Sequence, residues 1–247
     1  MTGVNWILGA SSGIGRALAL ALTARGETVA ISARRAGALA EVAGCASGLH
    51  AFPADARDPE ALREVVTAIE TGLGPIHRAF LNLGDYEPEA LGTLASGLHE
   101  RLMATNYLGV VNGMAAVLPG MRLRRAGELY ITASAAGYRG LPNASAYGVT
   151  KAALIHLAEC ARLELAGDGI AVRVINPGFV RTPLTDKNRF SMPGLLSPEA
   201  AASRIVAALP GHGFEIAFPR RLVWPLKLLR VLPYALYFPL VGRMTRG

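Results

Sequence analysis

The 247-residue sequence predicts an α/β fold: a single doubly wound parallel sheet of about seven strands, flanked by helices on both faces, with a hydrophobic basic C-terminal tail. Three observations predict it. Short apolar segments alternate with segments of helical periodicity, which favours a parallel sheet covered on both faces. A glycine-rich turn joins the first strand to the first helix. The sequence is 51% hydrophobic and 17% charged, so it can bury the core of one such domain.

The individual elements follow in order along the chain. The first strand is the apolar run 4–8, and the Arg-Ala-Leu-rich segment 16–22 is a strong helix former that ends near Gly26. The other predicted strands are the short apolar segments 28–32, 51–54, 78–83, 128–133, 171–176 and 215–218. The other predicted helices are the segments 59–71, 91–118, 147–166 and 198–209.

The net charge of +7 is concentrated in the tail. No internal repeat or linker marks a second domain, so we expect one domain at 1–218 and an appended tail at 219–247. Beyond Glu215 there is no acidic residue, whereas six basic residues lie there: Arg220, Arg221, Lys227, Arg230, Arg243 and Arg246. The remaining body is nearly neutral, so we expect no nucleic-acid partner.

The two cysteines and the N-terminus indicate the compartment. Cys45 and Cys160 form neither a metal-ligand cluster nor a disulfide framework, which suits a reducing environment, and we expect no metal. The N-terminal residues lack the pattern of an export signal. These features predict a cytoplasmic protein.

The glycine-rich turn predicts a phosphate-binding site. Gly9, Gly13 and Gly15 lie between the first strand and the first helix. Glycines there permit positive φ and allow backbone N–H groups to approach a phosphate, which the helix N-terminus also attracts. A glycine-rich turn without a ligand is the alternative for the triplet taken alone.

Tyr147 and Lys151 are the candidate chemical centre. They are four residues apart in a predicted helix, so their side chains share one face. A nearby ammonium favours the phenolate and would lower the tyrosine pKa from about 10, which would make Tyr147 a general acid or base. An exposed helix face is the alternative for this pair alone.

Several motifs in order along residues 1–210 resemble the compact form of the short-chain dehydrogenase/reductase family, which has a Rossmann-like fold. Gly9 to Gly15 matches the family's cofactor turn, Asn82 to Gly84 the end of its Asn-Asn-Ala-Gly turn, and Tyr147 to Lys151 its Tyr-x-x-x-Lys signature. Asp55, Asn106, Ser134 and the segment 176–182 match further motifs of the family, whereas Leu8, Leu81 and Leu83 depart from them.

The resemblance implies an NAD(P)-binding catalytic domain at 1–218 and gives each residue a role. Tyr147 would exchange a proton with the substrate oxygen and Lys151 would hold the nicotinamide ribose. Ser134 would hydrogen-bond the substrate oxygen, and Asn106 would hold a relay water. The implied cofactor-binding residues are Gly9, Ser11, Ser12, Gly13, Ile14, Gly15, Arg34, Arg35, Asp55, Asn82, Gly84, Tyr147, Lys151, Pro177, Gly178, Val180 and Thr182.

Arg34 and Arg35 predict a preference for NADP(H) over NAD(H). An acidic residue after the second strand would bind the adenosine ribose and repel a 2′-phosphate. The sequence has Ser-Ala-Arg-Arg there, and guanidinium groups pair with phosphate. A solvated loop is the alternative. The loop 183–196, with Phe190, Met192 and two leucines, favours a small or elongated apolar carbonyl or alcohol substrate.

Three interpretations of the tail stay open. Three prolines and two charges within 222–241 argue against a membrane span. Arg220, Lys227 and Arg230 project within about 80° of one another on a helical wheel, which suits a segment lying in the membrane interface. The tail could instead cap the substrate pocket or form a dimer interface, and the helices at 91–118 and 147–166 could also form a homodimer. The alternative to an enzyme is a non-catalytic, cofactor-binding, membrane-associated scaffold.

Overall fold

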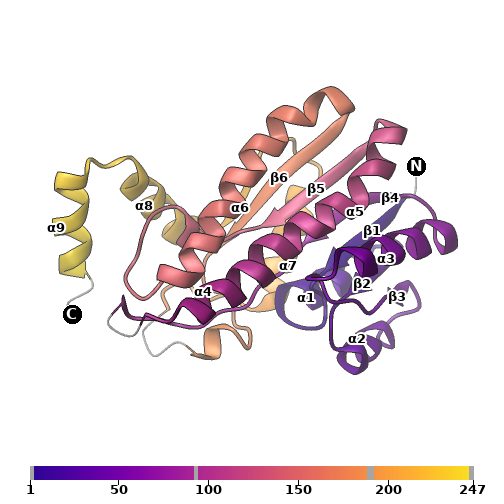
Figure 1. Cartoon of the computed structure of the whole chain (residues 1–247), viewed down its shortest axis with the longest axis horizontal. Coiled ribbons are helices and arrows are strands. Elements are labelled where there is room, and N and C mark those ends of the chain that lie inside the picture. Colours follow the sequence, from indigo (N-terminus) through magenta and orange to yellow (C-terminus); the bar gives the residue numbers. More distant parts are fainter. Residues whose placement is uncertain (1–2, 92–93, 188–191, 245–247) are drawn as a thin grey trace.

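A seven-stranded parallel sheet with the strand order β3-β2-β1-β4-β5-β6-β7 forms the centre of the molecule, and helices cover both of its faces (Figure 1). The structure is a computed structural model that describes residues 3–91, 94–187 and 192–244. The strands are β1 (Val4–Leu8), β2 (Val29–Ser32), β3 (Leu49–Ala51), β4 (Ile76–Leu81), β5 (Gly127–Thr132), β6 (Ile170–Pro177) and β7 (Glu215–Phe218). The predicted fold class is therefore confirmed.

The central strands bury side chains on both faces because they lie between two layers of helices. On β1, Trp6 and Leu8 point into one core cluster, and Ile7 points into the other. The first cluster is covered by α3 (Pro59–Gly72), α5 (Gly109–Arg124) and α6 (Ser145–Glu164). The second is covered by α1 (Gly13–Thr23), α2 (Ala36–Ala43) and α7 (Pro198–Ala208). Both faces of the sheet are thus sealed from water, which leaves the carboxyl ends of the strands as the edge available for a site.

Three element predictions need correction. The third strand is β3 at Leu49–Ala51 rather than 51–54, because it pairs with Val29–Ile31 of β2. Helix α2 was not predicted; it is short and buries only Leu39 and Val42. The helix predicted at 91–118 begins at Ser96 as α4 (Ser96–Leu102), passes through a π-helical segment, Met103–Leu108, and continues as α5 to Arg124.

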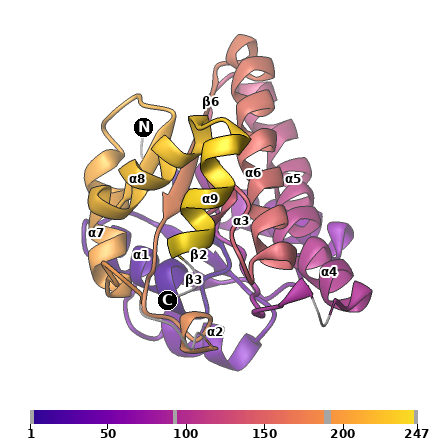
Figure 2. The same ribbon diagram turned by 90° about the vertical axis from the view of Figure 1, so that its left-hand side faces the viewer.

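The tail forms two helices. Helix α8 (Arg220–Val231) follows β7 and packs against it, and α9 (Tyr234–Met244) extends away from the body at the left of Figure 1. The chain bends between them at Leu232 and Pro233, where an extended residue precedes the proline. Figure 2 shows both helices in front of the sheet, on the outside of the molecule.

Candidate active site

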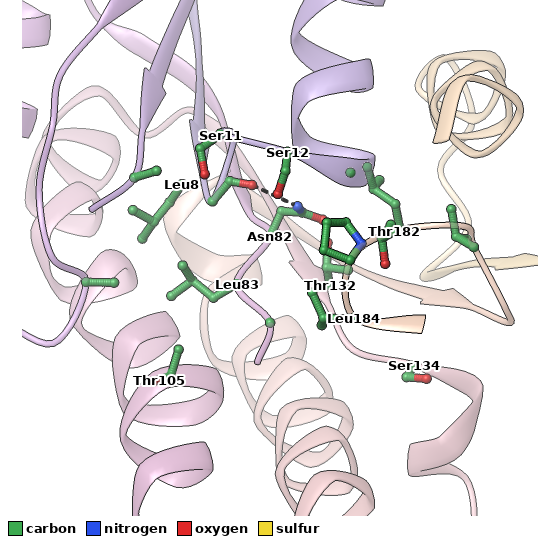
Figure 3. Close-up of a pocket in the computed structure, with 18 of the residues that line it drawn as sticks. Leu8, Ser11, Ser12, Asn82, Leu83, Thr105, Thr132, Ser134, Thr182 and Leu184 are labelled. Carbon is green, nitrogen blue, oxygen red and sulfur yellow. Dashed lines mark hydrogen bonds between the residues drawn. The ribbon is translucent and has the colours of Figure 1, made fainter. Parts of the chain in front are cut away.

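A cleft of about 360 Å³ lies at the carboxyl ends of β1, β4, β5 and β6. Its length runs from Ser11 and Ser12 at one end to Ser134 at the other (Figure 3). The predicted residues that line it are Gly9, Ser11, Ser12, Gly13, Ile14, Arg34, Arg35, Asp55, Asn82, Gly84, Ser134, Tyr147, Lys151, Pro177, Gly178, Val180 and Thr182. Residues far apart in the sequence meet here because each follows a strand of the same parallel sheet.

The glycine turn is built so that only glycine fits. Gly9 has φ +95°, and a Cβ there would lie 2.5 Å from the carbonyl oxygen of Asn82. The Asn82 side chain donates back to the Gly9 carbonyl at 3.1 Å, which fixes the turn (Figure 3). Gly15 is buried behind the turn and does not line the cleft; a Cβ there would collide with the Gly9 carbonyl oxygen. This cradle at the N-terminus of α1 fits a dinucleotide pyrophosphate.

Three arginines, Arg34, Arg35 and Arg57, line the cleft at its Ser11 end. Arg34 and Arg35 are exposed and line it, and Arg35 donates to the Ser11 hydroxyl at 3.3 Å. Arg57 also lines the cleft and forms a hydrogen-bonded ion pair with Asp55. Its Nε lies 3.1 Å and 3.0 Å from the two carboxylate oxygens. This hydrogen bonding lowers the pKa of Asp55, so the carboxylate stays ionised and paired. Sequence reasoning missed Arg57, because only the fold shows that it lines the same cleft as Arg34.

Ser134, Tyr147 and Lys151 line the opposite end of the cleft. Ser134 follows β5, whereas Tyr147 and Lys151 lie one turn apart on α6. Lys151 is only 1% exposed, and its Nζ donates to the main-chain oxygens of Leu83 and Thr132, each at 3.0 Å. The same Nζ lies 5.6 Å from the centroid of the Tyr147 ring. The lysine is therefore held rigidly beside the phenol without a direct bond to it.

The pKa of Tyr147 shifts opposite to the expected direction. Burial raises it to about 12, although the hydrogen bond from Ser134 acts to lower it. Burial also lowers the pKa of Lys151 to about 7. The expectation from the sequence considered the ammonium charge and neglected the loss of hydration that both groups suffer. Tyr147 is therefore a protonated phenol at neutral pH.

This burial predicts a pH-dependent stability. Between about pH 7 and 10.5 the unfolded chain holds the Lys151 proton more tightly than the folded protein does. The free energy of unfolding should therefore rise with pH across this window, by at most about 1.4 kcal/mol per pH unit. Urea unfolding at several pH values measures this slope, and Lys151→Met should make it shallower. Equal slopes for both proteins would show that the Lys151 pKa is not depressed.

Asn106 does not line the cleft. It is fully buried in the π-helical segment, and its side-chain oxygen accepts from the Asp85 N–H at 2.6 Å. Its Nδ2 donates to the Asp85 carbonyl at 2.9 Å and to the Thr150 hydroxyl at 3.1 Å. In this structure the Asn106 side chain therefore fixes the loop after β4 against α6.

The beginning of the expected substrate loop, 183–196, lines the mouth of the cleft, but the apolar residues expected from it do not. Phe190 lies outside the described residues, and Met192, Leu195 and Leu196 are absent from the cleft lining as described. Leu184 of this loop lines the cleft (Figure 3). Nearby, the Tyr86 ring packs edge-on against the Tyr147 ring, with the two ring centroids 5.1 Å apart. Pro183 and Thr185, which like Leu184 belong to the predicted loop 183–196, also line the cleft. The lining residues outside the predicted site set are Leu8, Ala33, Ala54, Ala56, Leu83, Thr105, Thr132 and Ala133.

These residues are mostly small or apolar and carry no chemical signal of their own. They lie next to recognised motifs, and that position was the only feature from which the sequence could have predicted them.

Lys187 donates to the Tyr86 carbonyl at 2.7 Å and pairs with Glu87 at 3.0 Å. The segment after Thr182 is thereby tied to the loop after β4, across the Tyr147 end of the cleft.

Comparison with known proteins agrees with this geometry. The family described as short chain dehydrogenase matches residues 4–192. An uncharacterized oxidoreductase of Myxococcus xanthus is 33% identical over 235 residues, which cover 94% of this chain and 93% of that protein. Ketoacyl reductase HetN of Nostoc is 32% identical over 228 residues, which cover 87% and 78% of the two chains.

A solved short-chain dehydrogenase from Streptomyces avermitilis is similar over the whole chain. It has a TM-score of 0.86 at 27% identity, and the match covers 100% of this chain and 98% of that one. The cleft, with its glycine cradle and its Ser-Tyr-Lys end, lies in the part of the chain that these relatives share. The chain therefore belongs to the short-chain dehydrogenase family and is an NAD(P)-dependent oxidoreductase of a family that acts on small carbonyl and alcohol substrates.

Proposed function

We propose that the protein is an NADPH-dependent reductase of an apolar carbonyl compound, with Tyr147 as the proton donor. The observation that carries the proposal is the arrangement of one cleft, which brings Ser134, Tyr147 and Lys151 together at one end and Arg34 and Arg35 at the other. One elongated cleft would thus offer an acid, a donor to the substrate oxygen and cations for a phosphate, which supports the proposal.

The side chains divide the chemistry as follows. When bound in the cleft, a reduced nicotinamide would supply the hydride that the carbonyl carbon accepts. Tyr147 donates its proton to the carbonyl oxygen, so that an alcohol is formed, and Ser134 stabilises the charge that develops on this oxygen. A phenol whose pKa is raised to about 12 is protonated at neutral pH, as reduction requires. Tyr147 regains its proton from solvent. Lys151 holds the nicotinamide ribose.

We propose that Asn106 holds the water through which Tyr147 regains its proton from solvent. Its side-chain amide is already engaged with Asp85 and Thr150, so the main chain of the π-helical segment is the group we assign to the water. Such segments inside α-helices are frequent at functional sites.

The preference for NADPH rests on the charges beside β2. Arg34 and Arg35 follow this strand where a carboxylate would exclude a 2′-phosphate. The negative charge of Asp55 is paired with Arg57, so it opposes a phosphate at Arg34 and Arg35 less than an unpaired carboxylate would. The electrostatics of this end therefore favour the phosphorylated cofactor.

Arg34→Ala should weaken NADPH binding by about 10- to 100-fold, the range expected for losing a charge-assisted hydrogen bond to phosphate. NADH binding should change little, because it lacks the phosphate. Fluorescence titration of both cofactors measures the two Kd values. Arg25→Ala is the matched control, because Arg25 pairs with Glu27 and does not line the cleft. Equal loss for NADH and NADPH would contradict the assignment.

The substrate proposal rests on the apolar groups at the Tyr147 end. Leu184 lines the cleft there, and the Tyr86 ring packs on Tyr147. Ketoacyl reductase HetN, a relative named for a carbonyl substrate, supports the same class. NADPH oxidation with a panel of ketones and fatty-chain carbonyl compounds tests it. Binding of NADPH without turnover of any member would instead favour a non-catalytic scaffold.

We also propose that the protein is cytoplasmic and forms a homodimer. Leu123 on α5 and Leu163 on α6 are exposed large apolar side chains that a second copy could cover. The helical stretch 96–124 is long and apolar enough to cross a membrane by composition, but α5 packs against α3, β4 and β5 as part of the core. Contact with a membrane is therefore assigned to the tail, as a peripheral contact.

A further inference from the structure

Two cations of helix α8 form ion pairs with the body. Lys227 of α8 pairs with Glu215 of β7, and Arg230 pairs with Glu159 of α6 at 3.5 Å. These two cations were expected to face a membrane as part of one basic stripe with Arg220. The structure corrects that expectation, because two of the three are neutralised by acidic residues of the domain.

Arg139 fixes the bend between the helices. Its guanidinium donates to the carbonyl oxygens of Leu229 and Leu232, each at 2.6 Å, at the C-terminal end of α8. It also stacks under the rings of Tyr234 and Tyr237, at 4.8 and 4.0 Å from their centroids. The Tyr237 hydroxyl bonds the carbonyl of Gly140. The tail is thus a fixed structure, held to the segment between Ser134 and Tyr147.

The outward face of α8 is apolar. Trp224, Leu228 and Val231 follow the spacing i, i+4, i+7 of one helix face. They are exposed by 66%, 63% and 74%, although they are large apolar side chains. Helix α8 therefore has apolar side chains on two faces: Val223 and Leu229 are buried, whereas the stripe of Trp224, Leu228 and Val231 faces solvent.

Helix α9 extends this apolar surface. It packs on α8 through a small separate cluster that contains Leu229, Tyr237 and Val241. Its remaining large apolar side chains point outward, and those with more than two fifths of their surface exposed are Tyr234, Leu236, Phe238 and Leu240. Together the two helices expose more apolar side chain than scattered surface residues explain.

The basic residues around this apolar surface favour an anionic partner. Arg220 and Arg221 at the start of α8 and Arg243 near the end of α9 are exposed, and no acidic residue follows Glu215 in the sequence. A second copy of the same surface would bring cations against cations. An anionic bilayer offers both the opposite charge and an apolar layer beneath it.

We propose that the outward faces of α8 and α9, called here the tail face, dock in the interface of an anionic membrane. The two helices have 12 and 11 residues, so each is about 18 Å long or less and too short for a hydrocarbon core of about 30 Å. They therefore lie in the interface and do not span it.

Docking would place the substrate end of the cleft beside the bilayer. Helix α8 starts next to Gly178, which lines the cleft: a Cβ on Gly178 would lie 2.6 Å from Leu222 Cδ2. An apolar carbonyl compound dissolved in the membrane would then reach Tyr147 over a short path. This consequence rests on the proposed reductase function, whereas the docking itself does not.

The fluorescence of Trp224 reports docking directly. The chain has two tryptophans, and Trp6 is fully buried. Adding vesicles of phosphatidylglycerol mixed with phosphatidylcholine to the full chain should shift Trp224 emission to shorter wavelength. The protein should bind vesicles of phosphatidylcholine alone more weakly than the anionic vesicles. Each arginine that contributes about 1 kcal/mol at the anionic surface should account for a difference of about fivefold or more in affinity. The absence of a shift with anionic vesicles would overturn the proposal.

Co-sedimentation with the same vesicles supplies the matched comparison. Trp224→Ser/Phe238→Ser should lower the partition coefficient at least about tenfold. Leu123→Ser/Leu163→Ser removes side chains that are 87% and 80% exposed on the proposed dimer face of the body, and it should lower the partition coefficient by much less than the tail variant does, whether or not the dimer is lost. Equal losses in both double variants would overturn the assignment to the tail face.

Light scattering without vesicles tests the competing occupant. A dimer that becomes a monomer in Trp224→Ser/Phe238→Ser would show that a second copy covers the tail face, and would overturn the proposal. The vesicle measurements contain no substrate. A protein that docks but reduces no carbonyl compound would therefore contradict the proposed function alone, and one that reduces but does not dock would contradict only this inference.

Discussion

Replacing Tyr147 with phenylalanine should lower kcat/KM for carbonyl reduction by about 10²- to 10⁴-fold, the usual contribution of a positioned general acid. The substitution removes one hydroxyl and keeps the ring that packs against Tyr86. Lys151 holds its place through the carbonyls of Leu83 and Thr132, so the Kd for NADPH should stay close to the wild-type value. Steady-state oxidation of NADPH and a separate cofactor titration measure the two quantities.

Tyr86→Phe is the control for this result. Its ring contacts the Tyr147 ring, so it presents the second phenol at the same end of the cleft. Loss of the Tyr86 hydroxyl should change kcat/KM by less than about tenfold, because the acid is still in place. If the two variants were equally impaired, the assignment of the proton donor to Tyr147 would fail.

Gly15→Ala should destabilise the protein by about 3 kcal/mol or more and abolish measurable cofactor binding. The new Cβ would collide with the carbonyl oxygen of Gly9 and would lie 3.0 Å from the Ala10 Cα. Both neighbours are backbone atoms of the phosphate turn, so neither can move aside as a flexible side chain does. Urea unfolding and NADPH titration measure the two effects.

Gly37→Ala is the matched control for the same chemical change. Gly37 lies in α2, and a Cβ there meets nothing within 4 Å. Alanine in a helix costs less conformational entropy than glycine, so this variant should be as stable as the wild type or more stable. A fully stable Gly15→Ala protein that binds NADPH would show that the turn is not packed as described.

The elements that could be predicted are those whose signals lie within the element itself. Helices α3 and α7 begin at Pro59 and Pro198 as predicted. Asp58 and Ser197, the residues just before them, are the N-caps, and their side chains accept hydrogen bonds from the first turn of each helix. The apolar run of β1 lies at the predicted residues for the same kind of reason. Helix α2 escaped prediction because its two buried residues are too few to mark a helical period.

The parts that could not be predicted depend on residues far apart in the sequence. Lys227 and Arg230 looked like a membrane-facing stripe until the fold placed Glu215 and Glu159 beside them. The pKa of Tyr147 depends on how much water the folded cleft removes from its phenol, which spacing along a helix does not report. The motifs that line the cleft were recognisable because each is short and contiguous.

Transfer of deuterium from cofactor to product tests the central claim most directly. The protein is incubated with NADPH deuterated at C4 of the nicotinamide and with the panel of apolar carbonyl compounds, and the products are analysed by mass spectrometry. The account predicts an alcohol that carries one deuterium on the former carbonyl carbon when the label is on one of the two faces of C4. Tyr147→Phe should form this product at least about 100-fold more slowly under the same conditions. Bound NADPH with no labelled alcohol from any compound, in the wild type, would contradict it.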